Sequence, residues 1–301
     1  MKAEKIFDCL VAGEANVDLL LQQAPKLQFG KEKTCPSFEI VLGGSSAITA
    51  HNLAKLGTRV SFIGVVGQDL FGGFVQSRLA SASVDLSHFK RLGNKKTGIS
   101  IWHNDARQNR AGITYLGTIP LLRAADIETS LAQARHLHVG HYFLLQKLHK
   151  RAPALFRAAQ RLGLTTSLDC NYDPTEQWNS GIREVLRYTD IFFPNEDEAK
   201  RLTKKKSALA AARELGALAN TVAVKLGSRG ALVYSRDGVL RVPAKRVQVA
   251  DTIGAGDSFN AGYLSRFLQG GGTNECACAG IAAAAHCVTR VGGTAAFEGL
   301  R

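Results

Sequence analysis

The stretch DTIGAGDSFNAG, residues 251–262, has two glycines and two aspartates within residues 251–257, where a segment with helical spacing begins. The apolar run RVPAKRVQVA, residues 241–250, precedes it, so we expect a strand-to-helix turn. Helix N-termini carry unpaired N–H groups and partial positive charge, and they bind anions. Gly254 and Gly256 would let an anion approach those amides. Taken alone, the stretch supports two interpretations equally. One is an anion site with Asp257 as a catalytic carboxylate, and the other is a plain helix cap.

Composition limits the class of protein. The chain has 301 residues, of which 45% are hydrophobic and 21% charged, enough for one large α/β domain or two smaller ones. There is no apolar run of about 18 residues that could span a membrane, and the N-terminal segment carries acidic residues that a signal peptide lacks. The six cysteines are scattered without a CxxC pair. We therefore expect reduced thiols in a cytoplasmic protein.

A net charge of +13 favours anionic partners such as nucleic acid, a membrane surface or a phosphorylated small molecule. The one tight basic run, residues 204–206, follows a predicted helix, where positive charge suits the helix dipole. The other basic residues are dispersed, and aromatic residues do not alternate with them as a nucleic-acid stacking platform requires. We expect neither a nucleic-acid nor a membrane partner.

Apolar strand-like segments alternate with helical ones along the chain. The expected strands are 6–13, 59–67, 136–140, 165–169, 190–195, 221–227 and 231–235, and the expected helices are 46–57, 70–81, 149–163 and 207–217. Several of these strands are apolar almost throughout, which indicates burial on both faces. The pattern predicts a three-layer α/β/α fold with a mostly parallel central sheet, as a single domain over residues 1–301.

Two stretches interrupt this alternation. Residues 17–41 and 97–117, bounds that are approximate, lack helical periodicity and each resemble two strands joined by a polar turn. We expect them to meet as a small separate sheet. Ligands of parallel α/β sheets bind at the carboxyl ends of the strands. A sheet projecting over that edge would be a lid that excludes water from transfer chemistry.

Several nucleotide-binding and hydrolase motifs are absent from the sequence. There is no GxxxxGK[ST], no GxGxxG after the first strand, no GxSxG and no HExxH. The chain therefore has no Walker-type phosphate loop and no dinucleotide-binding fingerprint, and interpretations as a hydrolase or a metalloenzyme lose most of their support.

The glycine-rich turn resembles the second signature of the ribokinase-like (PfkB) carbohydrate kinase family, DTxGAGDxFxxG, at every fixed position. Further stretches resemble other family motifs in the right order: GGSSAITAHNLAKLG (43–57), GVVGQDLFG (64–72), SLDCNYDPTEQW (167–178), the NxxE of NEDE (195–198) and VKLGSRGALVY (224–234). The resemblance covers roughly residues 6–297. It implies a ribokinase-like fold and an ATP-dependent transfer of phosphate to a hydroxyl, expected to be a primary one, of a sugar or sugar-like molecule.

The resemblance also assigns roles at the turn. It makes Asp257 the base that deprotonates the acceptor hydroxyl. The backbone amides of Gly254, Ala255, Gly256 and Asp257 become the anion hole, and such electrostatic positioning is most of what phosphoryl transfer needs.

For the two substrates, the resemblance implies further residues. Those expected at the acceptor, besides Asp257, are Asn16, Asp18, Gly43, Gly44 and Asn52. Those expected at ATP are Asn195, Lys225, Gly227, Ser228, Gly230 and Gly256, with the adenine beside helix 279–288. Asp18 is the strongest acceptor candidate, since a buried carboxylate that accepts from two hydroxyls rejects substrates lacking them.

Metal ions follow from the same resemblance. Asn195 and Glu198 of NxxE suit a hydrated Mg²⁺ that bridges phosphates. Without the family, Glu198 would be interpreted as a helix surface residue. Asp251 and the Ile253 carbonyl match positions that bind an activating monovalent cation in many members, so K⁺ is a hypothesis for this protein.

The sequence departs from the family at two positions. Ile48 replaces the usual Asn of GGxxAN, and Asp173 replaces the usual Arg of DxNxRxxxW. Ile48 favours a less polar acceptor face, unless Asn52, one helical turn later, compensates. In the expected lid, Arg107 or Arg110 could meet a charged group on the acceptor, and Trp102 could stack on a sugar or a base.

Several functions remain open. A fructokinase- or ribokinase-like activity ranks first, followed by a sugar-acid kinase, such as one for 2-keto-3-deoxygluconate, and by a nucleoside kinase. A different class is a non-catalytic basic protein that binds a nucleotide or nucleic acid. Exposed lid strands in this fold often pair between subunits, so a homodimer through the lid is a further expectation.

Overall fold

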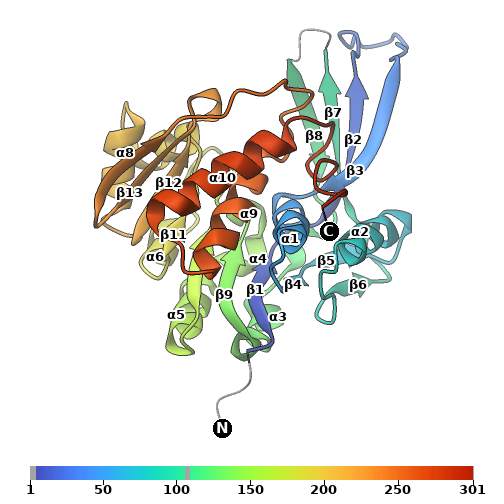
Figure 1. Ribbon diagram of the computed structural model, residues 1–301. Coiled ribbons are helices and arrows are strands. Elements are labelled where there is room, and N and C mark those ends of the chain that lie inside the picture. The colour runs from blue at the N-terminus through green and yellow to red at the C-terminus, as the bar shows by residue number, and fades with distance from the viewer. Residues whose placement is uncertain (1–4, 106–108, 301) are drawn as a thin grey trace.

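A computed structural model describes residues 5–105 and 109–300 as three layers, with helices on both faces of a large sheet (Figure 1). In spatial order the strands of this sheet are β14 (Gly238–Val242), β13 (Ala231–Ser235), β12 (Thr221–Lys225), β11 (Ile191–Phe192), β10 (Thr165–Leu168), β9 (Ala134–Val139), β1 (Phe7–Ala12) and β4 (Val60–Ile63). Neighbours from β12 to β4 are parallel, and β13 and β14 continue antiparallel. The predicted three-layer fold with a mostly parallel sheet is confirmed.

Burial on both faces explains why the strands are apolar throughout. In β1, Leu10 and Ala12 belong to one core cluster, whereas Cys9 and Val11 belong to the cluster on the opposite face. All four side chains are fully buried. Because successive side chains of a strand point to opposite faces, only an uninterrupted apolar strand can fill both clusters.

The helices divide between the two faces of the sheet. One core cluster includes residues of α1 (Ser45–Lys55), α2 (Leu70–Ser81), α9 (Ala255–Leu268) and α10 (Thr273–Cys287). The other includes residues of α3 (Ala124–Glu128), α4 (Gln146–His149), α5 (Ala152–Arg161), α6 (Ile182–Leu186), α7 (Glu196–Thr203) and α8 (Ala208–Leu215). Short 3₁₀ turns are η1 (Ile119–Leu121), η2 (Leu131–Gln133), η3 (Tyr142–Leu144) and η4 (Gly227–Arg229).

The two interrupting stretches form a second, four-stranded sheet. Its order is β3 (Ser37–Gly43), β2 (Asn16–Gln22), β7 (Gly98–Asn104) and β8 (Arg110–Tyr115). The parallel pairing of β2 with β7 joins the two stretches, and the outer pairs are antiparallel. Figure 1 shows this small sheet projecting from the three-layer body. The predicted separate sheet is therefore present.

Two expected strands differ from the structure. The segment 59–67 breaks at Gly64 into β4 and β5 (Val65–Gly67), and β5 pairs with β6 (Lys90–Leu92) outside the large sheet. The prediction that a strand over 241–250 leads into the turn is wrong, because β14 ends at Val242. Pro243 follows it and has no N–H for a ladder. The chain then runs irregularly to α9, and Ala250 N donates to Val288 O at the end of α10.

No helix among the described residues is both long and apolar enough to cross a membrane. The six cysteines are all free thiols, and Cys278 is the exposed one.

Close packing of α9 against α10 explains the last glycine of the 251–262 stretch. A Cβ on Gly262 would lie 2.5 Å from Ala279 O and 2.6 Å from Ala283 Cβ. One Cβ on Gly280 would likewise meet the Phe259 ring at 2.8 Å. Gly262 is therefore required by helix packing, which holds α9 in place, and not by contact with a ligand.

We predict that Gly262→Ala lowers the free energy of unfolding by about 1–3 kcal/mol, because the added methyl overpacks the α9–α10 contact. Chemical denaturation measures this change. Gly73→Ala is the matched control in α2, since a Cβ there meets nothing within 4 Å. The control should be neutral or stabilising by up to about 1 kcal/mol. Equal stabilities of the two variants would contradict the packing argument.

Candidate active site

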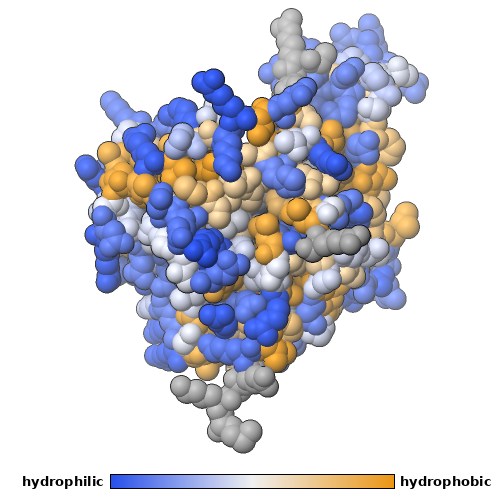
Figure 2. Space-filling model, in the orientation of Figure 1, coloured by the Kyte–Doolittle hydropathy of each residue, from blue (hydrophilic) through white to orange (hydrophobic). Residues whose placement is uncertain are grey.

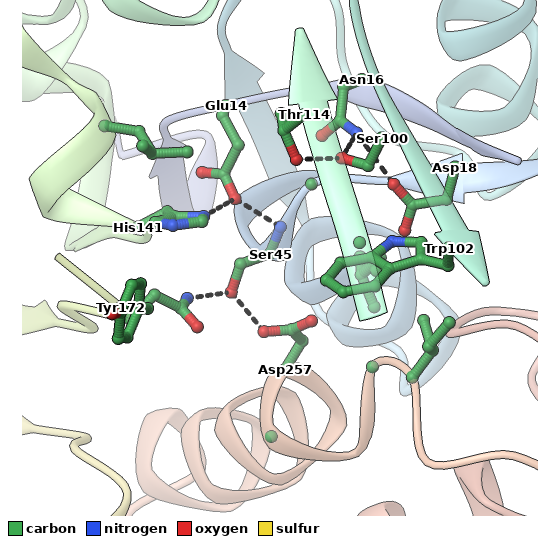
Figure 3. A pocket seen from close by; sticks show the side chains of 18 of the residues that line it. Glu14, Asn16, Asp18, Ser45, Ser100, Trp102, Thr114, His141, Tyr172 and Asp257 are labelled. Atoms are coloured by element: carbon green, nitrogen blue, oxygen red, sulfur yellow. Dashed lines mark hydrogen bonds and ion pairs between the residues drawn. The ribbon is translucent and has the colours of Figure 1, made fainter. Parts of the chain in front are cut away.

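A cavity of about 770 Å³ lies at the carboxyl ends of the parallel strands and extends to the small sheet (Figure 3). Five of the six parallel strands contribute a polar residue to this cavity, just past the last position of the strand or at its end. These residues are Glu14 after β1, His141 after β9, Asn171 after β10, Asn195 after β11 and Lys225 at the end of β12. The convergence follows from parallel strand direction, which brings all carboxyl ends to one edge.

The 251–262 turn forms the wall of this cavity where α9 begins. Gly254 is the N-cap, with φ 74°. A Cβ on Gly254 would lie 2.4 Å from the Cα of Gly293, so only glycine fits. The first bond within the helix runs from Ser258 N to Gly254 O at 2.8 Å. Helix geometry leaves the preceding amides for a ligand, although Ala255 N also reaches Thr252 O at 3.3 Å.

Asp257 lies in the first turn of α9, and its carboxylate faces the cavity (Figure 3). Burial raises the pKa of Asp257 to about 7; the Ser45 hydroxyl, which donates to Oδ1, lowers it, and the charge of Asp169 raises it further. A carboxyl group that titrates near neutral pH can take up a proton during catalysis.

Buried Glu14 and half-buried His141 form a pair that sequence reasoning missed. Glu14 Oε1 accepts from Ser45 N at 2.5 Å and lies 2.9 Å from His141 Nδ1, while Oε2 accepts from the Ser46 hydroxyl at 2.7 Å. Burial opposes a charge on His141, but the Glu14 carboxylate raises the pKa of this imidazole overall. The available signal was an acidic residue directly after an apolar strand, in AGEAN.

The small sheet carries the other polar wall of the cavity. Asn16 Nδ2 donates to Asp18 Oδ1 at 2.9 Å and to the Ser100 hydroxyl at 3.2 Å, and Thr114 donates to Ser100 at 3.0 Å (Figure 3). Burial raises the pKa of Asp18 to about 6. A Cβ on Gly43 would lie 2.2 Å from Asp18 Oδ1, so this glycine makes room for the carboxylate.

Two predicted acceptor residues on or before α1, Gly44 and Asn52, lie in different surroundings, with Ile48 between them in the sequence. Gly44 and Ile48 line the cavity. Gly44 has φ 89°, and a Cβ there would lie 2.8 Å from Glu14 O. Asn52 is fully buried, and its Nδ2 donates to the Ser258 hydroxyl and to Gly293 O, both at 2.9 Å. The expected acceptor contact of Asn52 is wrong, because packing of α1 on α9 uses its amide.

The other departure from the family, Asp173, has a local structural role. Its carboxylate accepts from the N–H groups of Thr175 at 2.9 Å and Trp178 at 2.7 Å, and from the Thr175 hydroxyl at 2.8 Å. Asp173 therefore organises the loop after β10.

Trp102 and Arg110, from the small sheet, both line the cavity. The guanidinium lies 5.2 Å from the centre of the indole ring. Arg110 also donates to Thr252 Oγ1 at 3.4 Å and lies 3.7 Å from Asp251 Oδ1. It thereby connects the small sheet to the glycine-rich turn. Arg107 lies outside the described residues.

The NxxE segment forms a reciprocal cap of α7. Asn195 Oδ1 accepts from Glu198 N at 2.9 Å, and Glu198 Oε2 accepts from Asn195 N at 2.8 Å. Glu198 is only 4% exposed, so its interpretation as a surface residue is wrong. Burial, reinforced by Asp169, raises the pKa of Glu198 to about 7. Both residues line the cavity, and their remaining oxygen lone pairs fit a Mg²⁺ ion that keeps its waters.

Lys225 lies at the boundary between two cavities. Its ammonium pairs with the buried Asp169 at 2.6 Å, and Asn260 Nδ2 donates to the same oxygen at 2.5 Å. The charge of Asp169 raises the pKa of Lys225 against the effect of burial.

A second cavity of about 860 Å³ lies between the loop after β12 and helix α10. Of the residues predicted for ATP, it is lined by Lys225, Gly227, Ser228, Gly230 and Gly256. Asn195 lines only the first cavity, whereas Lys225, Gly227 and Gly256 line both. Apolar residues complete the second cavity: Ala284, Ala285, Ile281, Phe259, Val288, Val247 and Val249.

The residues predicted for a monovalent cation connect two loops beside the turn. Asp251 accepts from Ile253 N and from Gly292 N, both at 3.0 Å. The Cys287 thiol donates to the carbonyl oxygens of Ile253, at 3.4 Å, and Gly293, at 3.5 Å. The Asp251 carboxylate and the Ile253 carbonyl are oxygen donors of the kind that suit a hard cation.

The chain matches the description "pfkB family carbohydrate kinase" over residues 7–298. It belongs to this family. It is therefore a kinase, and the family predicted from the motifs is confirmed.

Curated relatives include a ribokinase of Haemophilus influenzae, 29% identical, with 94% of this chain and 92% of the relative covered. Another is a deoxyribokinase of Salmonella typhi, 26% identical, with 97% and 96% covered. Among solved structures, Arabidopsis thaliana ribokinase complexed with ribose and ATP has a TM-score of 0.83 at 24% identity, covering 96% of this chain and 95% of that one. This last likeness shows the ribokinase-like fold.

Proposed function

We propose that this kinase transfers the γ-phosphoryl group of ATP to a hydroxyl, expected to be a primary one, of a small sugar. Residues 1–301 would act as one domain, with the small sheet as its lid. The observation that carries the proposal is the position of the glycine-rich turn. Asp257 lines the first cavity, Ala255 lines the second, and Gly256 between them lines both.

The chemistry follows from that position. The acceptor oxygen attacks the γ-phosphorus as the bond to the β,γ-bridging oxygen breaks, ADP leaves, and the acceptor proton passes to Asp257. The amides of Gly254, Ala255, Gly256 and Asp257 would stabilise charge on the transferred group. With a pKa of about 7, Asp257 is ionised at slightly alkaline pH and can still accept a proton.

The second cavity would hold the nucleotide. Its alanines on α10 leave a flat apolar slot for adenine, and Ser228 and Gly230 border the space for ribose and phosphates. Asn195 and Glu198 would hold Mg²⁺ through water, and the ion would neutralise charge on the phosphates.

The first cavity favours a sugar as the acceptor. Asp18 and Asn16 offer hydrogen-bonding groups for vicinal hydroxyls, and Ile48 lines the same space without a polar group. The ribokinase and deoxyribokinase relatives support a pentose or a deoxypentose as the acceptor. A sugar acid and a nucleoside are the competing acceptors within the same reaction.

Asp257→Asn tests the base. We expect turnover to fall by at least about a hundredfold while ATP binding is kept, because the variant cannot accept the proton. In the wild type, the base must be ionised, so kcat/KM should fall about tenfold per pH unit below about pH 7. ADP release over a panel of pentoses, deoxypentoses, hexoses, sugar acids and nucleosides measures both effects.

Two outcomes of this panel would contradict the proposal. A variant that retains the wild-type rate would exclude Asp257 as the base. If no compound is phosphorylated and the protein binds duplex DNA with strong salt dependence, the non-catalytic nucleic-acid-binding alternative is favoured.

We further propose that K⁺ activates the enzyme by binding at Asp251 and the Ile253 carbonyl. The Ile253 carbonyl directly precedes Gly254, so a cation there would stiffen the anion hole. Rates should be higher in potassium than in sodium or in a buffer without monovalent metal ions. Equal rates in all three would contradict this part alone.

We also propose a homodimer through the outer face of the small sheet. Paired positions place Ile40, Leu19, Ile101 and Ile113 in one apolar row across all four strands. Ile113 is 72% exposed and Ile40 43%. Figure 2 shows apolar side chains on this part of the molecule below the hydrophilic tip. Such a surface suits a second copy of the same sheet.

Ile113→Glu should convert the dimer to a monomer of 32.3 kDa, because like charges would then face each other across the interface. Sizing chromatography with light scattering measures the mass. Val239→Glu is the matched control, since Val239 is also exposed, at 44%, but lies on β14 of the large sheet. A monomeric wild type would exclude the dimer.

A further inference from the structure

Ser45 contacts the proposed base from the first position of α1. Its hydroxyl lies between two partners, Asp257 Oδ1 and Asn171 Nδ2, the latter at 2.8 Å (Figure 3). An amide nitrogen only donates, so the Ser45 oxygen accepts from Asn171 and the Ser45 proton points to Asp257. The direction of the bond to the carboxylate is therefore set by Asn171.

Ser45 and its donor Asn171 are each held in place by a backbone N–H that donates to a carboxylate. Ser45 N donates to Glu14 at 2.5 Å, which anchors the start of α1. Asn171 has φ 51°, a left-handed conformation that is uncommon for a residue other than glycine, and its N–H donates to Asp169 Oδ1 at 3.1 Å. Residues after β1 and β10 thus hold Ser45, which follows β3, against one carboxylate oxygen of α9.

Such an arrangement leaves the second oxygen of Asp257 for the acceptor. A hydroxyl that donates to a carboxylate favours its ionised form and fixes its rotation. We propose that Ser45, oriented by Asn171, is the positioning residue that aims Asp257 at the acceptor hydroxyl and holds it ionised. This inference rests on the proposed function of Asp257, and Ser45 itself exchanges no proton with the acceptor.

The test is the pH dependence of kcat/KM for Ser45→Ala, with the acceptor that the panel identifies. Loss of the donated hydrogen bond should raise the pKa of Asp257, so the acidic limb of the pH profile of kcat/KM should move up by about one pH unit. The rate should therefore fall about tenfold more at pH 6 than at pH 9, and kcat should fall more than KM changes. Ser45→Thr keeps the hydroxyl and should restore the limb.

Ser46→Ala is the matched control. It deletes the neighbouring hydroxyl of α1, which donates to Glu14 at 2.7 Å and not to Asp257. The acidic limb of this variant should stay at its wild-type position, whatever its stability. If Ser45→Ala does not fold, Asn171→Ala, in the loop after β10, carries the test and should move the limb in the same direction by less.

Three outcomes separate the inference from the proposed function. If Asp257→Asn keeps activity, the proposed function fails. If Asp257→Asn is inactive but Ser45→Ala or its substitute has the wild-type limb, the inference alone fails. A limb that moves equally in Ser45→Ala and Ser46→Ala also overturns it, since the effect would then come from general disturbance of α1.

Discussion

The close approach of Gly254 to Gly293 is the contact on which the site depends. With 2.4 Å between the position of a Gly254 Cβ and the Gly293 Cα, the two loops can meet only if residue 254 has no side chain. The left-handed turn at Gly254 then starts α9 at the junction of two cavities. The packing of Gly262 against α10 and of Asn52 against Ser258 keeps that start in place. One backbone geometry therefore determines where the proposed anion hole and Asp257 lie.

Charged groups gather at the carboxyl edge of the sheet, where burial would make isolated charges costly. The structure meets this constraint by pairing most of them. Lys225 pairs with Asp169, and His141 with Glu14. Asp257 and Glu198 carry carboxyl groups whose pKa values burial raises to about 7. Buried ion pairs beside carboxyl groups with raised pKa values are typical of the active sites of enzymes that move protons and phosphate.

The small sheet serves the site through its inner face. Asp18, Ser100 and Thr114 alternate with outward apolar residues, because the side chains of a strand alternate between faces. The bond of Arg110 to Thr252 and its proximity to Asp251 tie this sheet to the glycine-rich turn. The small sheet thus both lines the first cavity and contacts the glycine-rich turn.

The sequence by itself determined the family, the layer order and the helix start at Gly254–Asp257, because apolar periodicity and a contiguous motif are local properties. It also indicated Asp18 and the small sheet. It did not indicate that Glu14, Ser45, His141 and Asn171 form one network, or that Asn52 turns away from the cavity. Their hydrogen-bond partners come from separate strands and helices, so only the packing of those elements decides which atoms meet. The NxxE segment is a buried helix cap because β11 ends inside the molecule. The four residues of the motif do not by themselves indicate that burial.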